Sequence, residues 1–291
     1  MLLDDSTPPA STAPSLDPLL PAEMARKAET AGVTKATLPL SSLVVLGVLA
    51  GAFIALGAGF FTTVTSGSEL GYGPTRLLGG VAFSLGLILV VIAGAELFTG
   101  NNLMVMAWAG RRISSLQLLR AWAIVYAGNF AGAVATAAIV ALSGQWRFND
   151  YAVGGNALRI ADAKVNLDFI EAFFLGVLCN ALVCLAVWLT YSARSNLDKA
   201  VAIVFPITAF VASGLEHSIA NMYFIPLGLM LKSQDTVVAS SGLDEAQLAN
   251  LDIAHFFYAN LLPVTAGNIV GGGLLVAAIY WFVYRRTARD V

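Results

Sequence analysis

The sequence predicts an all-α membrane protein with six transmembrane helices. Of its 291 residues 58% are hydrophobic and only 12% are charged, and the mean hydropathy is +0.77. Soluble domains carry about 25% charged residues, roughly twice this share. The net charge of −2 gives no basic surface for nucleic acid. A soluble enzyme, a nucleic-acid binder, a disordered protein and a secreted disulfide domain are therefore poor fits.

Charged residues divide the chain into long uncharged stretches. Four stretches can each supply the roughly 20 apolar residues that a transmembrane helix needs: 36–68, 121–146, 172–193 and 253–284. Two longer stretches are each divided by one carboxylate: 77–110 by Glu96, and 200–231 by Glu216. As continuous helices they would measure about 50 Å at roughly 1.5 Å per residue, more than the hydrocarbon core of about 30 Å. We therefore expect spans two and five to be either steeply tilted or broken in the middle.

Basic residues orient the six spans. The side that holds both chain ends carries eleven Lys and Arg residues, and the opposite side carries five. The positive-inside rule then places both ends in the cytoplasm, and the expected location is the inner membrane of a bacterium. The expected segments are a flexible cytoplasmic tail at 1–21, a short amphipathic helix at 22–34, a pore domain at 35–285 and a cytoplasmic tail at 286–291.

The chain also repeats itself. Three pairs of segments match in the same order, one pair per span: 35–49 with 164–178, 94–101 with 214–221, and 127–132 with 266–271. They define a first repeat at about 35–145 and a second at about 164–285. Because each repeat holds three spans, the two must have opposite orientations, as in the inverted repeats of transporters and channels. Such proteins place their sites near the midplane, where helices are discontinuous.

Each expected break carries the pattern G-x-E-x-x-x-x-N, which supplies Glu96 and Asn101 to the first break and Glu216 and Asn221 to the second. A broken membrane helix exposes backbone N–H and C=O groups that are costly to leave unpaired. We expect these four side chains to support the breaks by hydrogen bonding. Direct ligand contact is the alternative, because carboxylates inside a membrane mark functional regions.

Few side chains at the breaks can do chemistry. His217 lies beside Glu216, and Thr99 adds a hydroxyl at the first break. A lone histidine is commonly a satisfied core residue, but the position of His217 within a repeated break favours a role in transport. A dry constriction is expected from nearby apolar residues, whose alternative role is ordinary packing: Phe83, Leu87, Leu97, Phe98 and Phe210. No metal-site, nucleophile-elbow or P-loop motif is present, so we expect no metal, no cofactor and no enzyme activity.

At these residues the sequence resembles the formate/nitrite transporter family. The segments 94–102 and 212–226 carry the resemblance, which extends from about Leu19 to Tyr284. It implies an aquaporin-like protomer of six helices with spans two and five broken, in a homopentamer with one pore per protomer. The family's central histidine, pore threonine, vestibule lysine and a span-four asparagine able to pair with the histidine map onto His217, Thr99, Lys164 and Asn180. Its hydrophobic constrictions map onto Phe83, Leu87, Leu97, Phe98 and Phe210.

The resemblance implies that small monovalent anions, protons, the lipid bilayer and further copies of the chain are the partners. The segments from Leu19 and Leu189 and the run Met-Tyr-Phe-Ile-Pro look most like the formate branch. Nitrite is the runner-up, and hydrosulfide, acetate and lactate stay open, as do the direction of flux and channel against proton-coupled transport.

A division of labour follows from the mapped residues. Lys164 would attract anions to the vestibule, and the anion must then cross a dry ring. Neutralising a small carboxylate at pH 7 costs about 4 kcal/mol. His217 could supply that proton, or its hydrogen bond could replace part of the hydration, and the sequence leaves both open.

Two functions of other classes compete with an anion pore. A neutral-solute pore of the aquaporin type shares the architecture, but neither break carries Asn-Pro-Ala and Lys164 suits anions better. An intramembrane enzyme could use Glu216 and His217, but it would need a nucleophile or a metal that the sequence does not supply.

Overall fold

The computed structural model describes residues 17–286, and every regular element within that range is helical. Residues 1–16 of the predicted N-terminal tail and residues 287–291 of the C-terminal tail lie outside the described residues. The α-helices are α1 Pro21–Ala36, α2 Leu40–Thr65, α3 Tyr72–Ile88, α4 Val105–Ala109, α5 Ser115–Ser143, α6 Ala152–Val165, α7 Phe169–Ser192, α8 Asn196–Ala212, α9 Ser218–Leu231, α10 Asp235–Ser241, α11 Ile253–His255, α12 Leu262–Ile269 and α13 Ile279–Tyr284. The π-helical segments are Leu89–Gly94, Phe256–Leu261 and Val270–Ala278, and the 3-10 segments are Gly100–Met104, Gln145–Arg147 and Gln247–Asn250.

Within residues 17–286, five helical stretches are long and apolar enough to cross a membrane: Leu40–Thr65, Tyr72–Gly94, Ser115–Ser143, Phe169–Ser192 and Ile253–Tyr284. The predicted fifth span consists of two shorter helices, α8 and α9. The prediction that spans two and five are interrupted is confirmed. The last span follows one helical path but includes two π-helical segments, which its apolar composition did not predict.

Both interruptions lie in the middle of their spans. In the first, α3 continues through the π-helical turn Leu89–Gly94, and residues 95–99 are then non-helical. In the second, α8 ends at Ala212, and residues 213–217 are non-helical before α9 begins. Gly94 and Gly214 have φ of +85° and +72°. Only glycine adopts this left-handed region without strain, which explains the first position of the repeated G-x-E pattern.

The repeated Gly-Asn motifs let pairs of helices approach closely. A Cβ atom on Gly132 of α5 would clash with the backbone of Val48 on α2, and one on Gly271 would clash with the backbone of Val177 on α7. Small residues at such crossings let the backbones of membrane helices meet. The repeat motif therefore marks the same helix crossing in each half of the chain.

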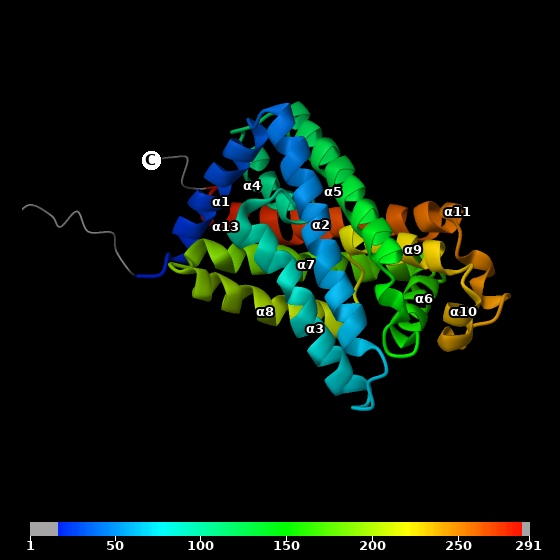
Figure 1. The fold of residues 1–291 in the computed structure, drawn as a ribbon. Coiled ribbons are helices and arrows are strands. Elements are labelled where there is room, and N and C mark those ends of the chain that lie inside the picture. Colours follow the sequence, from blue (N-terminus) through cyan, green and yellow to red (C-terminus); the bar gives the residue numbers. More distant parts are fainter. Residues whose placement is uncertain (1–16, 287–291) are drawn as a thin grey trace, which may run out of the picture.

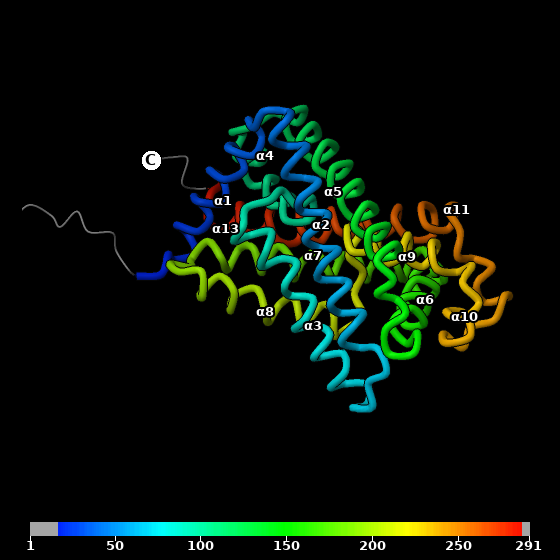
Figure 2. The backbone as a smooth tube through the Cα atoms, viewed as in Figure 1, coloured from blue at the N-terminus to red at the C-terminus, as the bar shows by residue number. Residues whose placement is uncertain are grey.

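The two ends of the molecule differ in what covers them. At one end α1 packs against α4 and α13, and at the other α6 packs against α9 and α10 (Figure 1). Figure 2 follows the backbone and shows the dark-blue α1 close to the red C-terminal helix. The interrupted spans lie between these ends, and the functional site is built where they meet.

Candidate functional site

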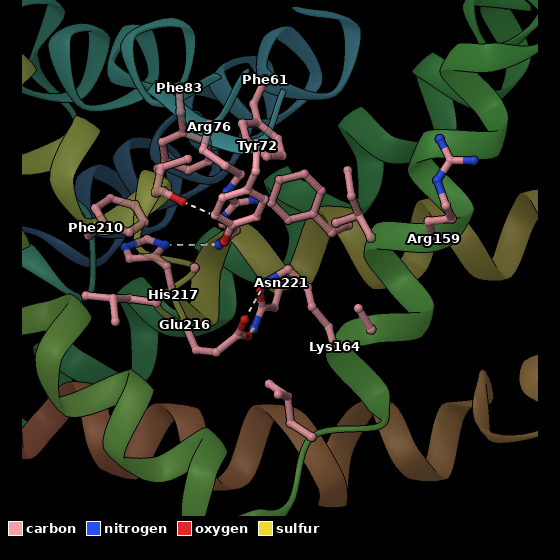
Figure 3. Close-up of a pocket in the computed structure, with 18 residues that line it drawn as sticks. Phe61, Tyr72, Arg76, Phe83, Arg159, Lys164, Phe210, Glu216, His217 and Asn221 are labelled. Carbon is pink, nitrogen blue, oxygen red and sulfur yellow. Dashed lines mark hydrogen bonds and ion pairs between the residues drawn. The ribbon is translucent and has the colours of Figure 1, made fainter. Parts of the chain in front are cut away.

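A cavity of about 340 Å³ leads to the second break, and we call it the vestibule. Its lining includes Phe61, Arg76, Phe83, Lys164, Phe210 and His217. Figure 3 shows Lys164 near Glu216 and Asn221, and Arg76 near Phe83 and Tyr72. The walls are mostly apolar, and the polar groups converge on the break. This combination is typical of a site for a small polar ligand.

His217 closes the inner end of the vestibule and begins α9. Its Nδ1 accepts a hydrogen bond of 3.1 Å from the backbone N–H of Ala220, so the side chain is the N-cap of the helix. An acceptor nitrogen carries no proton, and in neutral imidazole the proton is therefore on Nε2. Nε2 lies 2.9 Å from Thr99 Oγ1, to which it donates. Helix capping thus fixes the tautomer and turns the N–H of His217 toward the first break.

Two aromatic rings and the histidine form the inner wall of the vestibule. The rings of Phe83 and Phe210 meet edge to face at 5.5 Å, and Phe210 stacks on the His217 ring at 5.9 Å. Leu87 is buried in the same apolar core. Phe83 and Phe210 therefore contact each other directly beside His217.

Leu97 and Phe98 lie on the other side of Thr99. Leu97 is buried in the core. Phe98 packs edge to face against Trp122 at 5.9 Å and Tyr126 at 4.9 Å, and it lines a second, apolar cavity between α5 and the last span. The structure brings together Phe83, Phe210, Thr99 and His217, and it places the Phe98 ring with a different set of aromatic side chains.

Two asparagines from spans three and six satisfy the broken backbones. Asn129 donates to the carbonyls of Gly47 and Glu96 and accepts from the N–H of Phe98. Asn268 repeats this pattern with the carbonyls of Gly176 and Glu216 and the N–H of Ser218. Each asparagine is fully buried. We call Asn129 and Asn268 the break asparagines.

The side chains expected to support the breaks form two ion-pair clusters instead. In the first, Glu96 accepts from Asn101 at 2.8 Å and pairs with Lys35 at 2.8 Å. In the second, Glu216 accepts from Asn221 at 2.6 Å and pairs with Lys164 at 2.7 Å. The second cluster has an additional member, Asn260, which donates to Glu216 and accepts from Asn221. The carboxylates thus bind side chains, whereas the break asparagines bind the backbone.

The position of Asn180 differs from the implied pairing with the histidine. Its Nδ2 donates to the carbonyl oxygens of Thr99, at 3.3 Å, and Asn268, at 2.7 Å. Asn180 therefore ties the Thr99 backbone to span six.

Sequence reasoning assigned no role to the break asparagines, to Lys35 or to Arg76. The repeat matched Asn129 with Asn268 and Lys35 with Lys164, so transferring a role from one half to the other would have found Lys35. Asn260 and Arg76 lie outside every repeated motif. Within residues 17–286 no group of three His, Cys, Asp or Glu side chains could hold a metal ion.

Comparisons with known proteins agree with this architecture. The family described as "Formate/nitrite transporter" matches residues 22–282. The chain is 46% identical over 273 residues to the "Formate channel FocA" of Escherichia coli (strain K12), covering 93% of this chain and 96% of the relative. It is 42% identical over 261 residues to the "Formate channel FocA" of Haemophilus influenzae, covering 89% and 92%.

A solved structure named "Pentameric formate channel with formate bound" aligns with a TM-score of 0.77 and 41% identity, covering 84% of this chain and 97% of that one. The family is one of multi-pass membrane transport proteins rather than enzymes. The chain therefore belongs to the formate/nitrite transporter family.

Proposed function

We propose that this chain is a formate channel that assembles as a homopentamer, with one pore in each protomer. The relatives that share 42–46% of its residues are named formate channels, and a pentameric formate channel shares its fold. The observation that carries the proposal is a vestibule with mostly apolar walls whose inner end is closed by His217, with Nε2 of His217 lying 2.9 Å from Thr99 Oγ1. A small anion with hydrogen-bond acceptors matches that end.

The pathway has three steps. An anion enters the vestibule and moves toward its inner end, which lies beside Glu216 and His217. It then passes Phe83 and Phe210, where it loses most of its water. At the break it accepts the Nε2–H bond of His217, which replaces part of the lost hydration.

The hydrogen bond between Thr99 and His217 must break before the anion can bind His217. In the structure its hydroxyl is the acceptor of the His217 N–H, so the anion and Thr99 compete for one donor. The Thr99 backbone belongs to the non-helical first break. A movement of that segment would break the Thr99–His217 bond and join the vestibule to the other side. We propose Leu87, Leu97 and Phe98 as the apolar residues along this second part of the path.

The fixed tautomer favours hydrogen bonding over proton transfer by His217. A neutral imidazole that gave up its proton would become an anion. To protonate the passing anion and end as a neutral ring, His217 must therefore first carry a proton on both ring nitrogens. A proton on Nδ1 would remove the acceptor of the Ala220 N–H and uncap α9. We therefore propose that neutral His217 donates a hydrogen bond during passage, and that any proton coupling requires the cap to open.

The remaining expectations complete the proposal. The protein lies in a bacterial inner membrane with both termini in the cytoplasm, as the eleven-to-five distribution of basic residues indicates. We also propose the domain limits expected from the sequence, which are tails at 1–21 and 286–291, a short helix at 22–34 and a pore domain at 35–285; in the structure that helix is α1, Pro21–Ala36.

Uptake into proteoliposomes tests the proposal. We would compare formate with nitrite at pH 7 and pH 5 for the wild type, His217→Phe and His217→Asn. Asparagine retains both a cap acceptor and an N–H donor, whereas phenylalanine removes both. We expect formate to be preferred, His217→Phe to lose at least about tenfold in rate, which is the effect of 1.4 kcal/mol, and His217→Asn to keep most of the rate.

Other outcomes have distinct meanings. Unaltered anion flux in His217→Phe would contradict the proposed role of the histidine. Loss of the pH response in His217→Asn, with wild-type flux at pH 7, would favour proton transfer. Equal or greater nitrite flux would overturn the choice of formate. Faster osmotic shrinkage in sorbitol without anion flux would indicate a water pore.

A further inference from the structure

The vestibule contains two cations near its inner end, and they differ in how much of their charge is cancelled. Lys164 forms an ion pair of 2.7 Å with Glu216, and both side chains are largely buried. The pair has no net charge, so its field falls off as that of a dipole. An approaching anion therefore experiences little net attraction from Lys164.

Arg76 has a different set of partners. Its guanidinium donates to the carbonyl oxygens of Val211, at 2.5 Å, and Ala212, at 3.4 Å, and it lies 5.5 Å from the centre of the Phe61 ring. None of these groups carries a formal charge, and within residues 17–286 no ion pair involves Arg76. The end of α8 offers at most about half a negative charge. Arg76 thus keeps a net positive charge beside the vestibule.

We propose that Arg76, rather than Lys164, supplies the positive potential that draws monovalent anions into the vestibule. The inference rests on the proposed anion channel and assigns its steering residue. Arg76 is the fifth residue of α3, and its contacts with the end of α8 hold the guanidinium against the cavity wall. Its half-buried position keeps the charge close to the path of the anion.

Arg159 provides a matched control. It also borders the vestibule, but it is exposed, and its guanidinium binds the carbonyl oxygens of Ser240 and Ser241. Figure 3 shows it apart from His217, on the neighbouring helix α6. Arg159→Gln removes the same unit of charge as Arg76→Gln from a position open to water.

The test measures the initial rate of formate uptake into proteoliposomes of the full chain at low and high salt. A large impermeant anion such as gluconate sets the ionic strength at about 0.01 M or about 1 M on both sides, where the Debye length is roughly 30 Å or 3 Å. We expect Arg76→Gln to slow uptake roughly tenfold at low salt and less than about twofold at high salt, because steering is lost on screening. Arg76→Lys and Arg159→Gln should take up formate at the wild-type rate at both salt concentrations.

A second substitution keeps Arg76 and its contacts in place. Tyr72 is 78% exposed, and it lies four residues before Arg76 on α3. A carboxylate there can pair with the guanidinium. We expect Tyr72→Glu to reproduce the salt-dependent slowing, and Tyr72→Gln to leave uptake unchanged. The comparison of the two Tyr72 variants tests the steering role of Arg76 even if the Arg76→Gln protein does not assemble.

The inference is overturned if Arg76→Gln behaves like Arg159→Gln, or if Tyr72→Glu behaves like Tyr72→Gln. It is also overturned if Arg76→Lys slows uptake as much as Arg76→Gln at both salt concentrations, since the residue would then act only as a clamp on α8. A wild-type protein that takes up neither formate nor nitrite would overturn the proposed function and the inference together.

Discussion

The two interrupted spans are stabilised by the same kinds of hydrogen bond and ion pair, but the helices that flank the two breaks differ in type. Each break begins beside a left-handed glycine, Gly94 or Gly214, and each is bound by a break asparagine through three hydrogen bonds. Each also has a buried glutamate paired with a lysine. The two halves therefore use the same set of side chains to offset the cost of breaking a membrane helix.

The helix ends around the breaks differ. The second break lies between two regular α-helices, where Arg76 binds the last carbonyls of α8 and His217 caps α9. The first lies between the π-helical turn Leu89–Gly94 and the 3-10 segment Gly100–Met104. Irregular helices have poorer hydrogen-bond geometry. We therefore expect the second break, where the proposed anion site lies, to be the more rigid of the two, and the first to be the segment that moves.

The largest loss of stability should come from replacing the break asparagines, which both breaks share. Asn129→Ala and Asn268→Ala each remove the partner of two buried backbone groups in a break, one carbonyl and one N–H, at roughly 1–3 kcal/mol per group, and also a bond to a helix carbonyl. We expect each variant to lose at least about 3 kcal/mol of stability, which thermal unfolding in detergent would detect, and the two losses to be similar because the bonding patterns are the same.

Asn166→Ala is the control for this pair, because Asn166 is exposed and binds Asp162 and Asn250 at the surface. A stability loss in Asn129→Ala or Asn268→Ala no larger than in this control would contradict the role of the break asparagines.

A smaller loss of stability should result from breaking either ion pair, Lys164–Glu216 or Lys35–Glu96, and its size should differ between the two. Lys164→Met leaves Glu216 unpaired at 5% side-chain exposure, and Lys35→Met leaves Glu96 unpaired at 9%. An unpaired buried carboxylate is destabilising. Because water still reaches both lysines, we expect about 1–3 kcal/mol, with the larger loss for Lys164→Met.

Adding Glu216→Gln to Lys164→Met removes the unpaired charge and should restore part of the stability. The same unfolding measurement checks this. A larger loss in Lys35→Met, or no recovery in the double variant, would show that the pairing does not set the difference between the two halves.

The smallest effect concerns motion in the intact protein. If the first break moves, its amides open more often than those of the second, because local opening follows weak hydrogen bonding. We expect residues 95–104 to exchange hydrogen for deuterium at least about tenfold faster than residues 213–222, a difference of 1.4 kcal/mol in opening. Mass spectrometry of peptides from the native oligomer measures this, and slower exchange at 95–104 would reverse the assignment.

Much of the fold could be predicted because its causes are local in the sequence. Single carboxylates within stretches too long for one helix marked both breaks, and the repeat showed that the two breaks share one pattern. The repeat also located Asn129 and Asn268, although their role was not evident. That role depends on the three spans of each half meeting closely enough for one amide to reach three backbone groups, one on the first span of the half and two at the break.

Contacts across the fold could not be predicted. Thr99 and His217 are separated by 118 positions, and only the fold reveals their hydrogen bond. Phe98 was grouped with the constriction by its position in the chain, but its ring lies against Trp122 and Tyr126. Arg76 belongs to no motif, and its importance depends on where α8 ends.

The protonation state of His217 is the most direct test of this account. The chain has only two histidines, so protein with ¹⁵N-labelled histidine and the substitution His255→Gln reports on His217 alone. Solid-state NMR in lipid at pH 7 would distinguish the two ring nitrogens. We predict a neutral ring with the proton on Nε2 and none on Nδ1, as the cap on α9 requires. A proton on Nδ1, in either the other tautomer or the doubly protonated ring, would contradict the account.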